Sequence, residues 1–301
     1  ETKVSLIEKS SPNRKLDIYL RAYNDGAAFR YGIPVQENLS SFMISTEETY
    51  YNFSGDYKCW AMKKDRFRHS YEGEYREYNL SNINNKPGDS TSYFPYITLP
   101  LTMKMNDGLY ISVSEANITN YPGMHLTKQD GYTLKSKLAP DSLKKNISVR
   151  GNTPAVSPWR LFIIGSRPGA LIESNLIMNL NDPNKIPDAE SWIKPGKSTW
   201  SWWAEDRGFD PSFGYHILST KTVKYYIDFA AANNFQYVTL DGGWYGWFDA
   251  TKDDAVHDIT KSLPELDLPE VTRYAESKGI GIILWVVWYE LERQMKEAMD
   301  Y

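Results

Sequence analysis

The sequence predicts two domains: an antiparallel β-sandwich followed by the beginning of a parallel α/β domain. Three observations lead to this fold class. The chain has 301 residues, about two domains' worth, and 41% of them are hydrophobic, enough to fill a sizeable core. Up to about residue 190, short alternating segments are separated by Gly, Asn and Pro, as in antiparallel sheets. After residue 197 strand-like and helix-like patterns alternate, which is typical of parallel α/β domains.

Two hairpins with the same turn chemistry begin the first domain. Apolar residues alternate with other residues over 16–21, and Asn24-Asp25-Gly26 then supplies a tight turn. The same Asn-Asp-Gly turn recurs at 106–108. The strands beside these turns are expected over 16–21, 28–31, 96–104 and 109–113. Two such hairpins favour an antiparallel meander.

Later segments extend the sandwich to a linker. Further strands are expected over 132–138, 148–156, 159–166 and 174–178. No helix of more than three turns is expected before residue 190. Three prolines over 179–197 mark a linker. We therefore expect a sandwich over 1–190 and a second domain over 191–301.

The second domain opens with a strand, a helix and a buried strand. The strands are expected over 198–203 and 237–240. Between them, Val223, Ile227 and Ala230 share one helical face, and Asn233 ends the helix.

A second helix follows, with signals at both of its ends. Asp267 is a suitable N-cap, Pro269 lies in the first turn, and Gly279 is placed to end the helix. A third strand over 280–288 and a third helix over 290–301 complete a βαβαβα pattern. A closed (β/α)₈ TIM barrel needs about 250 residues. The chain therefore has room for about three of the eight units.

Composition argues against several function classes. The net charge is −4 without a basic stripe, which argues against nucleic-acid binding. The single cysteine, Cys59, cannot form a disulfide within the chain and is expected to be a buried thiol. No phosphate-binding loop, HExxH zinc motif or GxSxG elbow is present. No apolar run is long enough to span a membrane, and the first residues carry no signal peptide, so the protein is cytosolic or its leader has been removed.

Tryptophans cluster in the second domain, where strand ends should form a site. Only two of the ten Trp precede residue 192. Ligands of parallel α/β domains bind at the carboxyl ends of the strands, and aromatic rings beside a carboxylate suit a sugar. Alternatively, several Trp pack beneath the barrel mouth and the aspartate caps a turn. The candidate substrate-binding residues are Trp203, Asp241, Trp244, Trp285 and Trp288.

Glu115 is the candidate metal ligand of the first domain. It follows the expected strand over 109–113, and a carboxylate on a loop can bind a hard cation such as Ca²⁺. The alternative is a solvated or hydrogen-bonded glutamate without a ligand.

Several segments together resemble glycoside hydrolase family 97, in the same order along the chain. They are SEANITNYPGMHL (114–126), IESNLIMNLNDP (172–183), WIKPGKSTWSWW (192–203), YYIDFAAANNFQYVTLDGGWYGW (225–247) and DITKSLPELDLPEVTRYAESKGIGIILW (258–285). The resemblance implies an N-terminal β-super-sandwich, here expected without its first strands, followed by about three units of the catalytic (β/α)₈ barrel. It also implies a bacterial enzyme, periplasmic or secreted, that removes terminal α-linked sugars and holds an active-site Ca²⁺. By the same resemblance Glu115 would be the sandwich's Ca²⁺ ligand, and the other metal carboxylates would lie beyond this chain.

Two features favour the family's retaining, α-galactosidase-like branch. The third strand carries no carboxylate before Glu290, whereas the inverting branch has a glutamate base there. LDGGW (240–244) is similar to the strand end of related α-galactosidases, which implies that Asp241 binds a sugar hydroxyl, although Gly242 replaces a second aspartate. The nucleophile and the acid/base would then lie after Tyr301. The alternatives are an inverting α-glucosidase of this family and a non-catalytic carbohydrate-binding module.

Overall fold

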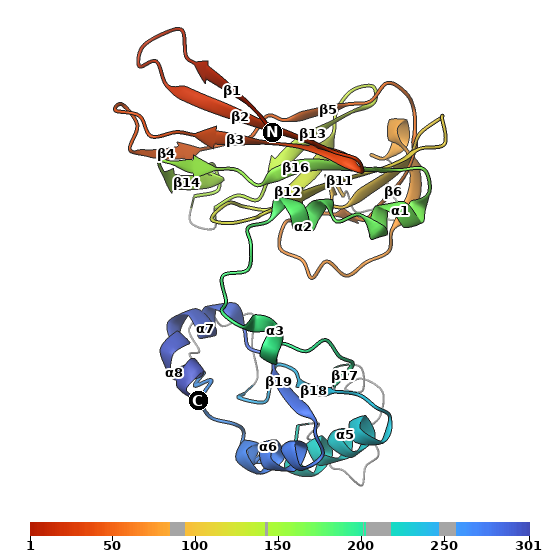
Figure 1. The fold of residues 1–301 in the computed structure, drawn as a ribbon, viewed down its shortest axis with the longest axis vertical. Coiled ribbons are helices and arrows are strands. Elements are labelled where there is room, and N and C mark those ends of the chain that lie inside the picture. Colours follow the sequence, from red (N-terminus) through yellow and green to blue (C-terminus); the bar gives the residue numbers. More distant parts are fainter. Residues whose placement is uncertain (85–93, 142–143, 201, 203–217, 247–256) are drawn as a thin grey trace. The chain divides into compact units, whose positions relative to one another are not determined.

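The computed structural model consists of two compact units, Glu1–Lys185 and Ile186–Tyr301, coloured from red to blue along the chain in Figure 1. It describes residues 1–84, 94–141, 144–200, 202, 218–246 and 257–301. The boundary between the two units lies inside the proline-containing segment over 179–197. Each unit has its own hydrophobic core. No helix among these residues is long and apolar enough to cross a membrane.

Unit 1 is built on two large antiparallel sheets. A nine-stranded sheet has the order β1-β2-β3-β16-β11-β10-β6-β8, with β15 paired to β3. A five-stranded sheet has the order β5-β13-β12-β9-β7, and β14 pairs with β4. The elements of unit 1 are β1 (Thr2–Ile7), β2 (Lys15–Tyr23), β3 (Gly26–Ile33), β4 (Ser41–Ile44), β5 (Tyr50–Asn52), β6 (Lys58–Ala61), β7 (Lys63–Lys64), β8 (Arg76–Asn79), a 3₁₀ turn (Leu80–Asn82), β9 (Tyr96–Ile97), β10 (Leu101–Lys104), β11 (Tyr110–Ala116), β12 (Met124–Lys128), β13 (Thr133–Leu138), β14 (Val149–Asn152), β15 (Ala155–Val156), β16 (Trp159–Gly165), α1 (Pro168–Glu173) and α2 (Leu176–Leu180).

Both predicted hairpins are confirmed at their turns, but the strand expected over 96–104 is divided between β9 of the five-stranded sheet and β10 of the nine-stranded sheet. Strands β2 and β3 pair up to Tyr23 and Gly26, at the first Asn-Asp-Gly turn. Strands β10 and β11 pair around the second turn, where Gly108 has φ +85°, a conformation that favours glycine. Gly26 has a second role, because a Cβ there would lie 2.1 Å from the backbone oxygen of Phe162. Glycine therefore lets β16 approach β3 closely.

The main core of unit 1 lies between its two sheets. Fully buried residues come from the nine-stranded sheet, such as Cys59 and Met103, and from the five-stranded sheet, such as Leu126 and Leu134. Buried and less buried residues alternate along β10 and β13, as in a β-sandwich. The expected buried thiol of Cys59 is confirmed, and burial raises its pKa to about 12.

The predicted strand over 174–178 is wrong. Helix α2 begins within this segment, at Leu176, and Leu176 and Leu180 are buried on one of its faces. These two side chains pack with Trp159 and Leu161 of β16 in a second, smaller core. Residues four apart share a face in a strand as well as in a helix, but Met178 between them is 74% exposed, which fits only the helix.

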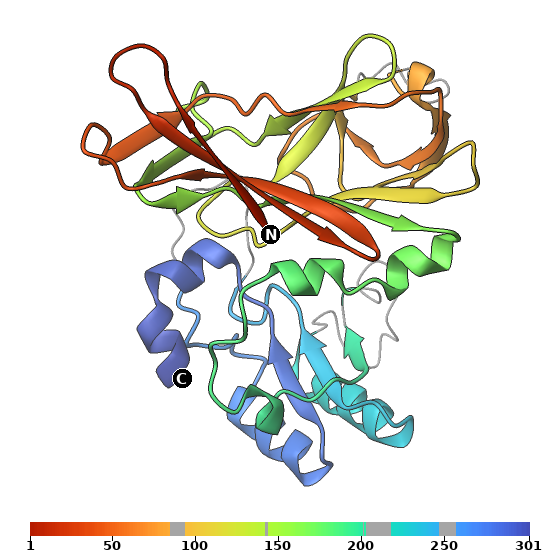
Figure 2. The same ribbon diagram turned by 45° about the horizontal axis from the view of Figure 1, so that its top comes forward.

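Unit 2 contains a parallel sheet of three strands in the order β17-β18-β19 within its described part. Helices α5 and α6 lie side by side (Figures 1 and 2), and Val223 of α5, Val271 of α6 and Val238 of β18 belong to one core. The βαβαβα order is therefore the predicted one. The elements of unit 2 are α3 (Ala189–Trp192), β17 (Ser198–Trp200), α5 (Thr220–Ala232), β18 (Tyr237–Leu240), α6 (Leu268–Ser277), β19 (Gly281–Leu284), α7 (Trp288–Arg293) and α8 (Met295–Asp300).

The signals at both ends of α6 act as predicted. The carboxylate of Asp267 accepts a hydrogen bond of 2.9 Å from the backbone N–H of Glu270, and Pro269 lies in the first turn. Gly279 follows the helix with φ +70°, which lets the chain turn back toward β19.

The last two expected elements of unit 2 have different bounds. The third strand is only β19, which ends at Leu284 rather than at Trp288. The last helix is interrupted at Gln294, whose φ of −125° and ψ of 27° are not helical, and so forms α7 and α8. The apolar stretch over 280–288 continues beyond the end of β19, so the strand predicted from it is too long.

Candidate functional site

The ends of β17 and β18 are joined by one buried carboxylate. Asp241 follows β18 directly and is 9% exposed. Its Oδ2 accepts a hydrogen bond of 2.5 Å from Nε1 of Trp200, the last residue of β17. Its Oδ1 accepts one of 2.5 Å from the backbone N–H of Gly242. The carboxylate thus links two neighbouring strand ends, as expected for the carboxyl edge of a parallel sheet.

Trp285 brings a second indole to this edge from β19. Its backbone N–H donates to the Leu240 carbonyl at 2.9 Å, which extends the contact between the two strands. A Cβ on Gly242 would lie 2.9 Å from Cζ3 of Trp285, so a glycine is needed for the ring to lie there. Trp285 and Trp200 are 38% and 40% exposed, so both indoles keep accessible surface close to Asp241.

The other predicted tryptophans have different environments. Trp244 is 1% exposed, and its indole N–H donates to the Trp285 carbonyl at 2.7 Å. Of the two alternatives for the tryptophans, Trp244 shows the packed one, because its ring lies in the core of unit 2. Trp288, the first residue of α7, is 71% exposed and contacts the ring of Tyr289 edge-on. Trp203 lies outside the residues that the structure describes.

Sequence reasoning missed Trp200. The pattern predicts a first strand that extends to residue 203, with Trp203 as its strand-end aromatic. The strand ends at Trp200, which pairs with Thr239, so its indole reaches Asp241 just beyond β18. The parallel register between the two strands carries this information, and the sequence of β17 alone does not.

The arrangement in unit 2 suits binding of a hydroxylated ligand. An ionised carboxylate has about four acceptor positions, and Asp241 uses two of them in the bonds described above. It can therefore accept further hydrogen bonds from ligand hydroxyls. The partly exposed rings of Trp200 and Trp285 offer apolar faces beside it.

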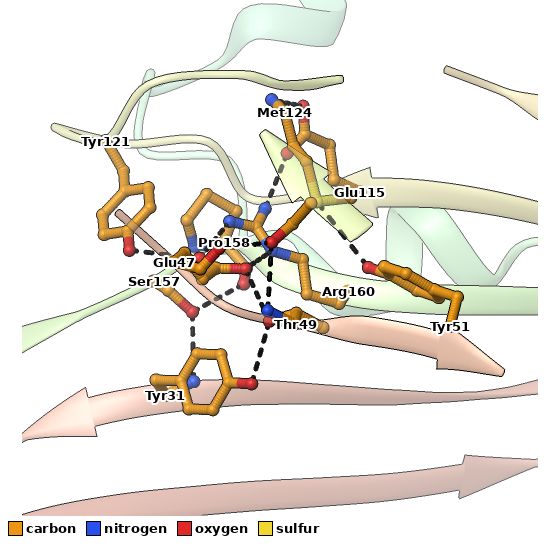
Figure 3. Close-up of polar contacts among 11 residues, drawn as sticks. Tyr31, Glu47, Thr49, Tyr51, Glu115, Tyr121, Met124, Ser157, Pro158 and Arg160 are labelled. Atoms are coloured by element: carbon orange, nitrogen blue, oxygen red, sulfur yellow. Dashed lines mark hydrogen bonds and ion pairs between the residues drawn. The ribbon is translucent and has the colours of Figure 1, made fainter. Parts of the chain in front are cut away.

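In unit 1, Glu115 lies within strand β11 rather than on the expected loop (Figure 3). It pairs in register with Arg160 of β16, and its Oε2 accepts a hydrogen bond of 2.7 Å from Nη1 of that arginine. Its Oε1 accepts one of 2.9 Å from the backbone N–H of Met124. Of the two alternatives for this residue, the structure shows the hydrogen-bonded glutamate.

Arg160 also binds a second glutamate, which sequence reasoning missed. Its Nε and Nη2 donate to the two carboxylate oxygens of Glu47 at 2.9 and 2.6 Å. Thr49 and Tyr121 donate their hydroxyl hydrogens to the same carboxylate, at 2.9 and 3.2 Å. We call Glu47, Arg160 and Glu115 the buried triad.

The charges of the buried triad are shielded from water. The side chains of Arg160, Glu47 and Glu115 are 0%, 5% and 9% exposed. Burial raises the pKa of Glu115, and the positive charge of Arg160 opposes this shift. Burial also lowers the pKa of Arg160, but its hydrogen bonds and the charges of both glutamates outweigh that effect and raise it above the usual value. The arginine therefore stays charged.

A Ca²⁺ ion would find one suitable carboxylate in the triad. Glu47 accepts four hydrogen bonds, which occupy its acceptor positions, whereas Glu115 accepts two. The donor chemistry of Glu115 therefore fits a single ligand of a hard cation. No group of three or more His, Cys, Asp and Glu in the described part of the chain could hold a metal ion. Glu115 would thus need ligands from elsewhere.

Relatives with described activities match most of this chain. It is 30% identical to a retaining alpha-galactosidase of Bacteroides thetaiotaomicron over 94% of its length and 44% of the relative's. It is 25% identical to a probable retaining alpha-galactosidase of Streptomyces bingchenggensis, over 92% of its length and 38% of the relative's. The chain thus spans less than half the length of these curated relatives.

Solved structures and family sequence models agree with these matches. A glycoside hydrolase family 97 enzyme from Pseudoalteromonas sp. strain K8, in complex with acarbose, aligns with a TM-score of 0.82 at 27% identity. The alignment covers 99% of this chain and 44% of the solved one. The model described as "Glycosyl-hydrolase 97 N-terminal" matches residues 1–183, and that described as "Glycoside hydrolase 97" matches residues 202–301. The chain belongs to glycoside hydrolase family 97.

Proposed function

We propose that this chain is the N-terminal and middle part of a retaining, α-galactosidase-like hydrolase that removes terminal α-linked sugars. The observation that carries the proposal is the 30% identity to a retaining alpha-galactosidase across 94% of the chain. The probable retaining alpha-galactosidase from Streptomyces gives independent support. The carboxylate and indoles at the strand ends of unit 2 have the chemistry that such a substrate needs.

We further propose that unit 2 is the first part of a (β/α)₈ barrel, with a domain boundary near residue 190. Its parallel strands and alternating helices have the order of a barrel's first units. The sheet-rich unit 1 would then be the family's super-sandwich.

In this proposal unit 2 binds the substrate, and the reacting carboxyl groups lie after Tyr301. Asp241 accepts hydrogen bonds from sugar hydroxyls, while Trp200 holds its carboxylate in place and, with Trp285, offers a ring face. Retention requires a nucleophile and an acid/base with carboxyl groups about 5 to 5.5 Å apart. An aspartate and a glutamate in the longer protein would supply them.

We propose Ca²⁺ as the cofactor and Glu115 as its ligand in unit 1. The two open acceptor positions of this carboxylate support the proposal. When bound, the ion would supply positive charge, and oxygen atoms of the substrate could coordinate to it. Glu115 would hold one of its coordination positions, and its bonds to Arg160 and Met124 would fix the carboxylate's orientation.

The direct test is hydrolysis by the full-length protein. We expect release of p-nitrophenol from p-nitrophenyl α-galactoside and loss of activity with EDTA. NMR of the first sugar released should show the α-anomer. A β-anomer would refute the retaining mechanism, and unchanged rates with EDTA would refute the role of Ca²⁺.

A second candidate is an inverting α-glucosidase of the same family. It is favoured by the match to the Pseudoalteromonas enzyme, whose solved complexes contain acarbose and panose. Hydrolysis of panose and p-nitrophenyl α-glucoside, with no hydrolysis of the α-galactoside, would support this candidate. Sugar binding without hydrolysis of either substrate would indicate a carbohydrate-binding module.

We propose a periplasmic or secreted location for the longer protein, on its resemblance to the bacterial members of this family. Fractionation of cells that express the full-length gene tests this location. Recovery of the protein only in the cytosolic fraction would contradict it.

A further inference from the structure

The buried triad holds two carboxylates for one guanidinium. With its side chains at most 9% exposed, water screens these charges poorly. When all three groups are ionised, the cluster carries one net negative charge. The hydrogen bonds of the triad show where that charge lies.

Arg160 divides its hydrogen bonds unequally between the two carboxylates. Two of its nitrogens bind both oxygens of Glu47, whereas one nitrogen binds one oxygen of Glu115. A paired arrangement of this kind is the stronger form of guanidinium–carboxylate contact. The charge of Arg160 is therefore balanced mainly by Glu47.

Glu47 and Glu115 also differ in the number of acceptor positions that remain open. Thr49 and Tyr121 complete four hydrogen bonds to Glu47, and this carboxylate has no open acceptor position. Glu115 accepts two hydrogen bonds from the part of the chain that the structure describes, which leaves about two of its acceptor positions open there. It is also the most exposed side chain of the three, at 9% against 5% for Glu47 and 0% for Arg160.

We infer that Glu47 is a positioning residue for cation binding at Glu115: by neutralising Arg160, it leaves the charge and open acceptor positions of Glu115 available to a divalent cation. This inference rests on the Ca²⁺ part of the proposed function. Without the charge of Glu47, Arg160 would pair with Glu115 alone and would repel a cation beside it. Glu47 would thus control cation affinity without touching the ion.

Calcium titration of the full-length protein by calorimetry tests this role. We expect Glu47→Gln to weaken Ca²⁺ binding by at least about tenfold, because a buried charge acts through a low effective dielectric. Glu115→Gln should abolish binding. Tyr121→Phe is the matched control, since it removes one hydrogen bond to Glu47 and no charge. Its affinity should stay within about threefold of that of the unmodified protein.

A double variant separates charge balance from a structural role. Glu47→Gln combined with Arg160→Gln removes both opposing charges and leaves Glu115 negative. We expect this variant to recover most of the affinity lost in Glu47→Gln, whereas a structural role predicts a further loss. Glu47→Asp keeps the negative charge and should bind Ca²⁺ more tightly than Glu47→Gln. If Glu47→Gln does not fold, the comparison of Glu47→Asp with the unmodified protein still tests the role of the charge.

Several results would overturn the inference. They are unchanged affinity in Glu47→Gln, further loss in the double variant, equal affinities of the Asp and Gln variants, or no Ca²⁺ binding by the unmodified protein. Hydrolysis of p-nitrophenyl α-galactoside is measured in parallel. An active enzyme that binds no Ca²⁺ would refute the metal role alone, and an inactive protein with the expected affinities would refute the activity alone.

Discussion

Replacing Arg160 with Met should be among the most destabilising single changes in unit 1. Arg160 is fully buried and donates three hydrogen bonds to Glu47 and Glu115, at 2.6 to 2.9 Å. Methionine would leave two carboxylates buried without a countercharge. Breaking a buried ion pair by removing one partner costs about 3 to 5 kcal/mol. A protein domain is stable by only about 5 to 15 kcal/mol, so a large part of its stability would be lost.

Urea unfolding, followed by circular dichroism, measures this loss. Arg167→Met is the control, because Arg167 and its partner Glu173 are more than half exposed and the pair should contribute little. Replacing Glu47, Arg160 and Glu115 together by Gln, Met and Gln should be milder than Arg160→Met alone, since no buried charge remains. A midpoint for Arg160→Met equal to that of Arg167→Met would refute the reasoning.

Three further predictions concern single positions. Burial, and then the neighbouring His69, lower the pKa of His125 to about 4. In the unfolded chain the pKa of this histidine is near 6.5, so the unfolded chain binds the proton more tightly than the folded chain does. The free energy of unfolding should therefore decrease as the pH drops from about 6.5 to 4. His125→Gln should flatten this slope in urea titrations, and an unchanged slope would contradict the prediction. Gly242→Ala would place a Cβ 2.9 Å from the Trp285 ring, and we expect a cost of about 1 to 3 kcal/mol and altered tryptophan fluorescence, whereas an unchanged spectrum would argue against this contact. Asp267→Ala removes the N-cap of α6 and should cost about 1 kcal/mol in urea unfolding; Asp267→Ser should restore most of it, and equal losses in both variants would rule out capping.

Local sequence signals predicted much of the fold. Three signals involve only residues that are close together in the chain: the Asn-Asp-Gly turns, the N-cap Asp267 and the change of pattern after residue 197. The structure agrees with each of them. Predictions were poorer where apolar runs lacked such signals. Residues 176–178 of the strand expected over 174–178 belong to helix α2, and the strand expected over 280–288 ends at Leu284.

The strand-end site was predicted in part. The position of Asp241 after a buried strand follows from the rule that ligands bind at the carboxyl ends of parallel strands. Its partner Trp200 depends on the register between β17 and β18, and the burial of Trp244 depends on the packing of a whole core. Aromatic composition alone does not distinguish a ring that packs inside from one that faces a ligand.

The order of strands and helices, the two-part organisation and the resemblance to one family all follow from the sequence, because they depend on local patterns along the chain. The environment of Glu115, in contrast, depends on contacts between residues that are far apart in the chain. Its partner Arg160 lies 45 residues away, and the link from Arg160 to Glu47 spans 113 residues. No local pattern encodes such distances. Sheet pairing brings Glu115 and Arg160 into register, and burial makes the charge balance of the triad matter.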